Sequence, residues 1–314
     1  MITRSEVEGA AARIGDRVRR TPVMRHGSAN GPEVWLKLEQ TQHTGSFKAR
    51  GAFNRILSAA ADGRLPESGV IAASGGNAGL AFAFAARELG VPAEVYVPMT
   101  SPMVKVDRLR DLGADVVQIG DRYAEAYDAA TKRAADTGAL FCHPYDQPEV
   151  CAGQGTLGLE LLEQTGGDVD TILIAVGGGG LMAGVAAAVE GRARVVGVEP
   201  ETAPTLHRAL AAGRPVDVEV SGVAMDSLGA PRIGEIAFAV ATRTGVPSVL
   251  VPDAAIVAAR QRLWDEHRLV VEHGTAAAYA ALLTGAYEPA AGERAAVVLC
   301  GANTDPGDLV PTTR

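Results

Sequence analysis

The sequence predicts an α/β protein made of two doubly wound domains, with mainly parallel sheets and a ligand site in the cleft between the domains. Short runs rich in Val, Ile and Leu are apolar along their whole length, as strands buried on both faces are. Alanine-rich segments of helical length separate most of these runs, for example AGLAFAFAARELG and YAEAYDAATKRAADTG. Three runs end in glycine-rich turns that open into a helix, and α/β proteins bind ligands at such turns.

The chain begins with a helix and continues through nine strands. Charged and apolar residues alternate every three or four positions over residues 1–20, which predicts a first helix and not a signal peptide. Nine strands are many for one sheet of ordinary width, so we expect two domains. We place a small domain at 69–146 and a large one at 1–68 plus 147–314. The predicted strands are 34–40, 69–75, 93–99, 114–120, 140–146, 171–177, 194–200, 248–253 and 294–301.

The composition excludes several classes of protein. The 314 residues are 47% hydrophobic and 21% charged, as in soluble globular proteins. A net charge of −8 argues against a surface for nucleic acid or anionic membranes, and no apolar stretch is long enough to span a bilayer. Cys142, Cys151 and Cys300 lack the spacing of a disulfide framework or a zinc site. We therefore expect a cytoplasmic protein that binds neither nucleic acid nor membrane.

The strongest local signal is the glycine run in AVGGGGLMAG. Gly177, Gly178, Gly179 and Gly180 carry no side chains, so their N–H groups can close around an anion at the start of the next helix. A phosphate group is the natural ligand. The same segment, with Glu199 about 20 residues further on, also fits a dinucleotide fingerprint, which would indicate a nicotinamide-dependent oxidoreductase.

A second glycine-rich turn, ASGGNAG, supplies hydrogen-bond donors. Ser74, the backbone of Gly75 and Gly76, and the Asn77 amide suit a carboxylate or a polar ring substituent at another helix start. Ser74 and Asn77 could equally act only as helix caps. The residues of this loop alone leave both interpretations open.

Lys48 stands in HTGSFKARGA, between a predicted strand and an amphipathic segment. The chain has only four lysines, and arginine carries most of its positive charge. A lysine near a helix start is usually solvated. The positive end of the helix dipole also makes Lys48 easier to deprotonate, and a neutral amine is what a Schiff base requires. Together with a phosphate loop and a carboxylate loop, this lysine predicts a site for pyridoxal phosphate and an amino acid.

At this point the chain resembles a known family. The segments HTGSFKARGA, SGGNAG, GQGTLGLEL, VGGGGLMAG and VLCGANTD are similar to the motif series of the pyridoxal-phosphate-dependent serine/threonine dehydratases, in the same order. These ammonia-lyases belong to the tryptophan-synthase-β-like fold group, so the resemblance implies that fold, with the active site in the interdomain cleft. It also implies a homodimer.

The resemblance assigns roles by position. Lys48 would be the Schiff-base lysine, and Ser74, Gly75, Gly76 and Asn77 would take the substrate carboxylate. Glu272 lies in VVEHG, where the family usually has a proline in place of His273, so its role is left open. The residues that would contact the cofactor are Phe47 and Asn77 at its ring, residues 177–180 at its phosphate, and Cys300 at its pyridine nitrogen.

Variable positions favour elimination within this family. Relatives that racemise serine carry a serine where this chain has Gly75, which cannot move a proton. Ala78 and Cys300 are similar to the residues of some serine dehydratases, and SGGNAG does not match the TSGNTG of β-replacement enzymes. We expect β-elimination of L-threonine, L-serine or a close β-hydroxy amino acid to a 2-oxo acid and ammonia. β-Replacement and racemisation are the alternatives within the fold.

The resemblance also implies a cation site. Glu199, Ala203 and Thr205 occupy the family's ligand positions. Because threonine replaces a second acid, a monovalent ion is expected more than a divalent one. An empty site is the alternative.

Overall fold

The structure contains two sheets. The larger sheet consists of β1 (Val23–His26), β2 (Val34–Lys37), β7 (Thr171–Ala175), β8 (Arg194–Pro200), β9 (Ser248–Val251) and β10 (Ala295–Val298). The smaller consists of β3 (Val70–Ala73), β4 (Ala93–Val97), β5 (Asp115–Gln118) and β6 (Leu140–Cys142). The computed structural model describes residues 2–27 and 33–310.

The strand order is β1-β2-β10-β7-β8-β9 in the larger sheet and β5-β4-β3-β6 in the smaller one. Within the described ranges every strand pair is parallel except β1 with β2. The α/β class with mainly parallel sheets is therefore confirmed, and each of the nine predicted strands is present. Strand β6 is shorter than expected, because the chain leaves the sheet after Cys142.

Strand β1 was not predicted. It lies at the edge of the larger sheet, its residues are partly buried or exposed, and only its first two residues, Val23 and Met24, are apolar.

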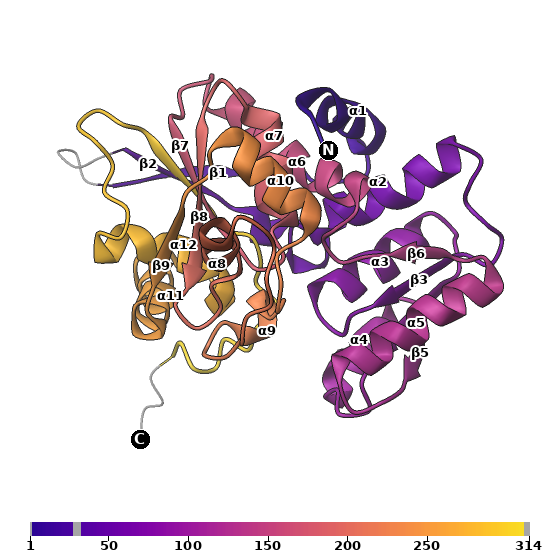
Figure 1. Ribbon diagram of the computed structural model, residues 1–314. Coiled ribbons are helices and arrows are strands. Elements are labelled where there is room, and N and C mark those ends of the chain that lie inside the picture. The colour runs from indigo at the N-terminus through magenta and orange to yellow at the C-terminus, as the bar shows by residue number, and fades with distance from the viewer. Residues whose placement is uncertain (1, 28–32, 311–314) are drawn as a thin grey trace.

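Helices cover both sheets, and the two sheets lie side by side (Figure 1). Helix α1 is shorter than the predicted 1–20. The helices are α1 (Arg4–Ile14), α2 (Lys48–Ala61), α3 (Asn77–Glu88), α4 (Met103–Asp111), α5 (Tyr123–Thr137), α6 (Pro148–Gln164), α7 (Gly180–Val189), α8 (Thr205–Ala212), α9 (Met225–Leu228), α10 (Glu235–Thr244), α11 (Asp253–His267) and α12 (His273–Thr284), with 3₁₀ turns η1 (Glu39–Thr41) and η2 (His43–Gly45). None of these helices is long and apolar enough to cross a membrane.

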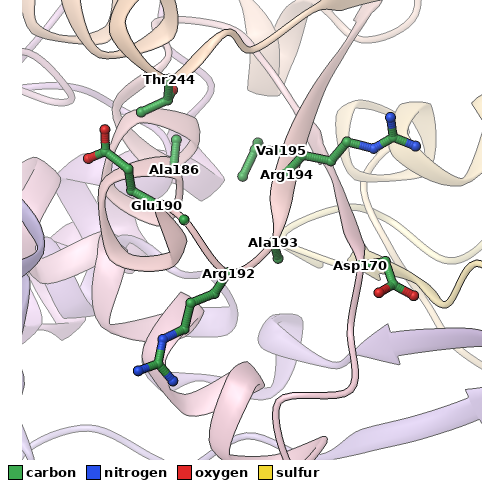
Figure 2. A pocket seen from close by; sticks show the side chains of 9 residues that line it. Asp170, Ala186, Glu190, Arg192, Ala193, Arg194, Val195 and Thr244 are labelled. Atoms are coloured by element: carbon green, nitrogen blue, oxygen red, sulfur yellow. The ribbon is translucent and has the colours of Figure 1, made fainter.

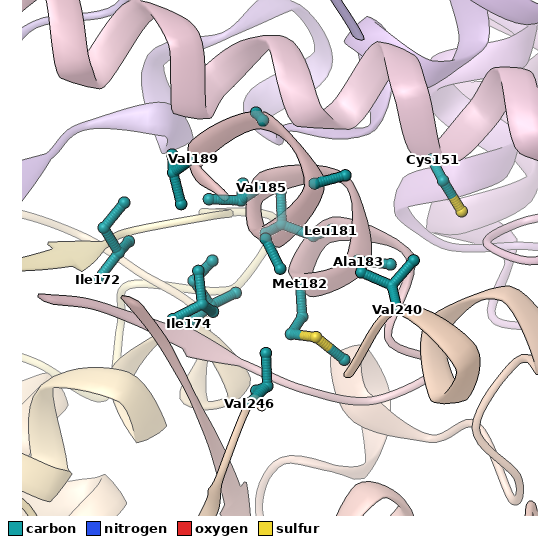
Figure 3. Close-up of a cluster of buried hydrophobic side chains, with 14 of the residues drawn as sticks. Cys151, Ile172, Ile174, Leu181, Met182, Ala183, Val185, Val189, Val240 and Val246 are labelled. Atoms are coloured by element: carbon teal, nitrogen blue, oxygen red, sulfur yellow. The ribbon is translucent and has the colours of Figure 1, made fainter. Parts of the chain in front are cut away.

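Helix α7 is the centre of the largest core cluster. All ten of its residues are buried, so it is apolar on every side. Ile172 and Ile174 of β7 face this cluster, whereas Leu173 and Ala175 face a second cluster formed with α11 and α12. Figure 3 shows α7 between the strand residues and Val240 of α10. This packing fixes the start of α7, where the glycine loop ends.

The motif GQGTLG has a packing role in α6. A Cβ at Gly155 would lie 2.4 Å from the carbonyl oxygen of Gly184 in α7, and one at Gly153 would lie 2.5 Å from that of Arg50 in α2. Only glycine allows such close approach of the backbones. Helix α6 thereby fixes α2 and α7 relative to each other. Because Lys48 begins α2 and the glycine loop leads into α7, the positions of both are fixed as well.

Residues 69–146 contain all the strands of the smaller sheet, and the rest of the described chain contains the larger one. The exact domain limits at 68/69 and 146/147 stay a prediction.

Candidate active site

The predicted site residues come together at the carboxyl ends of both sheets. The segment before α2 is joined to the end of β10 by an isolated bridge between Ser46 and Gly301. Next to it, the Phe47 amide donates a hydrogen bond of 3.0 Å to the Cys300 carbonyl. These contacts place Lys48, the first residue of α2, beside Cys300.

The Lys48 amine is turned inward and lacks a carboxylate partner among the described residues. Its Nζ donates to the Pro144 carbonyl at 2.6 Å and lies 4.9 Å from the centroid of the Phe47 ring. Burial of the amine lowers the pKa of Lys48 to about 8, because desolvation disfavours the charged form, and Glu272 opposes this only in part. A larger fraction of the Lys48 amine is therefore neutral at physiological pH than of a solvated lysine.

The glycine loop joins β7 to α7 and offers unpaired N–H groups. No acceptor is found within the described chain for the backbone N–H groups of residues 178–181. Gly179, Gly180 and Leu181 are buried, and buried N–H groups without acceptors are rare in proteins unless a ligand completes them. The same groups stand at the amino end of α7, where the helix dipole favours an anion. The loop fits a phosphate group.

Side chains are excluded from this loop by Tyr145. A Cβ at Gly178 would lie 2.4 Å from the ring of Tyr145, and one at Gly180 would lie 2.6 Å from its carbonyl oxygen. Gly179 has a φ of +82°, a conformation that favours glycine. Three of the four glycines are thus required by geometry.

Asn77 does not act as a helix cap. Helix α3 is capped by Gly76 without a side-chain hydrogen bond, and the Asn77 amide donates to both oxygens of Glu272 at 2.9 and 3.0 Å. Its own oxygen accepts from Asn303 Nδ2 at 2.6 Å. Burial raises the pKa of Glu272, while the Asn77 hydrogen bond opposes that shift. The Asn77 amide therefore faces the larger sheet and can donate to a negatively charged oxygen there.

The loop at Ser74 is close by and open. The Gly76 amide donates to Ser74 Oγ at 3.3 Å. A Cβ at Gly75 would meet no atom closer than 3.5 Å, and one at Gly76 would meet none within 4 Å. Unlike the loop at residues 177–180, this loop has free space beside its backbone.

Cys300 is a buried thiol. Its Sγ lies 3.2 Å from Thr275 Oγ1, and burial raises the pKa of Cys300 to about 12. The thiol is therefore neutral at physiological pH and cannot serve as an anionic partner for a pyridinium nitrogen.

Glu199 is completely buried and already satisfied. Its carboxylate accepts from Thr205 Oγ1, Leu206 N, His207 N and Ser248 Oγ at 3.1, 2.6, 2.8 and 2.6 Å. Ala203 is also buried, and its carbonyl accepts from the Thr205 amide at 3.1 Å. Glu199 thus serves the start of α8 and is not open to a ribose, which removes the support for the dinucleotide interpretation.

Sequence reasoning did not single out Asn303. Asn303 bonds the Thr44 carbonyl at 2.7 Å as well as Asn77, and Arg108 of α4 donates to it at 2.8 Å. It therefore connects the loop before Lys48 to helices over the smaller sheet. The sequence signal that could have identified Asn303 is its position in the glycine-rich turn CGANTD, directly after a predicted strand.

Comparison with known proteins gives the family. The family model described as Pyridoxal-phosphate dependent enzyme matches residues 14–301, and the chain belongs to this family. An L-threonine ammonia-lyase of Thermotoga maritima is 35% identical over 97% of this chain and 76% of that protein. A phenylserine dehydratase of Ralstonia pickettii is 38% identical over 96% of this chain and 93% of that protein. The structure of maize serine racemase superposes with a TM-score of 0.90 at 30% identity, covering 98% of this chain and 95% of that one.

Proposed function

We propose that this chain is a pyridoxal-phosphate-dependent ammonia-lyase that eliminates the β-hydroxyl of L-threonine, L-serine or a close β-hydroxy amino acid. The observation that carries the proposal is the Lys48 amine, which has a lowered pKa and donates to the Pro144 carbonyl. The next residue, Tyr145, packs directly on the glycine loop at Gly178 and Gly180. The names of the two dehydrating relatives support the same reaction class.

The residues present fit the cofactor. Residues 177–180 would hold its phosphate, Phe47 would lie against its ring, Asn77 would bond its ring hydroxyl and Cys300 would face its pyridine nitrogen. When bound, pyridoxal phosphate withdraws electrons from Cα of an amino acid. Because Cys300 is a neutral thiol, this withdrawal is weaker than with a carboxylate partner, which favours prompt loss of the hydroxyl over a long-lived carbanion.

The protein groups would then act on the substrate. The loop of Ser74, Gly75 and Gly76 would hold its carboxylate, and the Lys48 amine would take the Cα proton. Loss of this proton and of the β-hydroxyl gives an enamine, which hydrolyses to a 2-oxo acid and ammonia.

Gly75 distinguishes elimination from racemisation. Racemisation needs a second proton donor on the opposite face of Cα, and glycine supplies none. The space beside Gly75, with the nearest atoms at 3.5 and 3.8 Å, shows that crowding does not exclude a side chain there.

We further propose a homodimer in the cytoplasm, with a monovalent cation at Glu199, Ala203 and Thr205. The four hydrogen bonds to Glu199 mean that such an ion would have to displace donors already in place.

The test combines a spectrum with product analysis. The purified protein should absorb near the visible edge, and borohydride reduction should remove the band and label Lys48. L-Threonine, L-serine and phenylserine should be screened for 2-oxo acid release, and the remaining substrate for its D-enantiomer. Lys48→Met should lose both the band and the activity, whereas Lys132→Ala, at an exposed lysine, should keep them.

Two outcomes would contradict the proposal. A protein that stays colourless with added pyridoxal phosphate would overturn the cofactor assignment. D-Amino acid as the main product, without ammonia, would replace elimination by racemisation.

A further inference from the structure

A cluster of three possible metal ligands lies outside the candidate active site. It consists of His26 at the end of β1 and of Glu266 and His267 at the end of α11. One nitrogen or oxygen from each residue lies within 4.8 Å of the others. His26 pairs with Val34, the first residue of β2. The cluster therefore lies at the amino end of the parallel strands, whereas the glycine loop lies at their carboxyl end.

The geometry is close to that of a bound ion. His26 Nδ1 and His267 Nε2 are 2.8 Å apart, and Glu266 Oε2 is 3.8 Å from His267 Nε2. Ligands at the bond lengths usual for zinc are separated by about 3.3 Å in a tetrahedral arrangement. These two separations are within roughly half an ångström of this value. All three ligand atoms lie within 4.8 Å of one another, so an ion would draw the three side chains together.

Neighbouring groups orient two of the ligands. The Tyr279 hydroxyl lies 2.9 Å from His26 Nε2, which leaves Nδ1 facing His267. Arg262 Nε donates to Glu266 Oε1 at 2.6 Å and leaves Oε2 free. Metal-bound histidines commonly have such a partner on the second nitrogen, because it fixes the ring orientation.

Charge and access also suit a cation. The cluster stands at the carboxyl end of α11, where the helix dipole favours positive charge. The side chains of Glu266 and His267 are 38% and 20% exposed, which gives an ion a path from solvent.

We propose that His26, Glu266 and His267 form a binding site for a divalent transition-metal ion of the Zn²⁺ type. The ion would replace the direct His26–His267 contact and tie the edge strand β1 to α11. Two histidines and one carboxylate leave a fourth position for water, as in other open zinc sites.

The test is a titration of tag-free, metal-stripped holoenzyme with Zn²⁺ by calorimetry and with Co²⁺ by visible absorbance. We expect one ion per chain and a rise in melting temperature with Zn²⁺. His26→Gln and His267→Gln should each weaken binding by more than about 100-fold, and Tyr279→Phe by about 10-fold. His207→Gln, at an exposed histidine, should leave Zn²⁺ binding unchanged.

The same titration can overturn the proposal. Wild-type protein that binds no Zn²⁺ would contradict the proposal, and so would a His26→Gln variant that binds Zn²⁺ as tightly as wild type does. The contact between His26 and His267 would then be a structural hydrogen bond only. Should His26→Gln fail to fold, Glu266→Gln decides, because this partly exposed side chain should weaken binding without affecting folding.

Discussion

Lys37 and Lys48 are both turned into the protein, but their surroundings differ. Lys37 in β2 is fully buried, and its Nζ donates to Glu160 at 2.5 Å, to Gln164 at 2.8 Å and to a backbone carbonyl. Within the part of the chain that the structure describes, Lys48 donates to the Pro144 carbonyl alone. Burial lowers the pKa of both amines, but at Lys37 a carboxylate in direct contact opposes this shift.

The difference separates a structural cation from a reactive amine. Around Lys37, the Arg50 guanidinium also bonds Glu160 and Glu39, so each buried charge has an opposite partner. Such networks are costly to break, because removing one member leaves another charge buried. Among the described residues, Lys48 has no carboxylate partner. Its amine can therefore react with a ligand without leaving a buried charge unpaired.

Lys48→Met should give the largest effect, and it should fall on activity. We expect 2-oxo acid release to fall by at least about 10³-fold, because the base that takes the Cα proton is lost. The free energy of unfolding, measured with denaturant, should not decrease, because a desolvated amine without a carboxylate partner among the described residues is replaced by an apolar side chain of similar length. A large loss of stability would show that Lys48, like Lys37, is a structural residue.

Lys37→Met should have the reverse profile. It leaves Glu160 with Arg50 as its remaining charged partner, so we expect a loss of about 3 kcal/mol in the free energy of unfolding, the lower end for a broken buried pair. Folded protein should still bind pyridoxal phosphate and keep most of its kcat. Unchanged stability in urea would mean that the Lys37–Glu160 contact contributes nothing.

The same contrast explains what could be predicted from the sequence. Most strands could be predicted because they contain a run of apolar residues, and the glycine loops because several glycines stand together directly after such a run. Lys48 could be found because a short motif surrounds it. The network at Lys37 could not be predicted, because Glu160 lies more than a hundred residues further along the chain and only the tertiary fold brings α6 next to the end of β2.

The least predictable residues join the two sheets. Glu272, Asn303 and Asn77 form one hydrogen-bonded chain, although they come from three distant segments. Their roles depend on how the smaller sheet meets the larger one, which no local pattern specifies. Edge strand β1 was missed for a related reason, because a strand with partly exposed faces has no continuous apolar signal.

The smallest expected effect is a shift in the pH dependence of Lys48. In cofactor-free protein, uptake of pyridoxal phosphate requires the neutral amine, so its rate should rise with pH through a midpoint of about 8, well below the ordinary lysine value of 10.5. Cys151 and Cys300, whose pKa values burial raises to about 12, are neutral thiols at that pH. The charge that favours protonated Lys48 is therefore that of Glu272, and Glu272→Gln should move the midpoint to lower pH. Stopped-flow absorbance across pH 6 to 10 measures this, with Lys132→Ala as the control, and a midpoint near 10 would mean that the Lys48 amine is solvated.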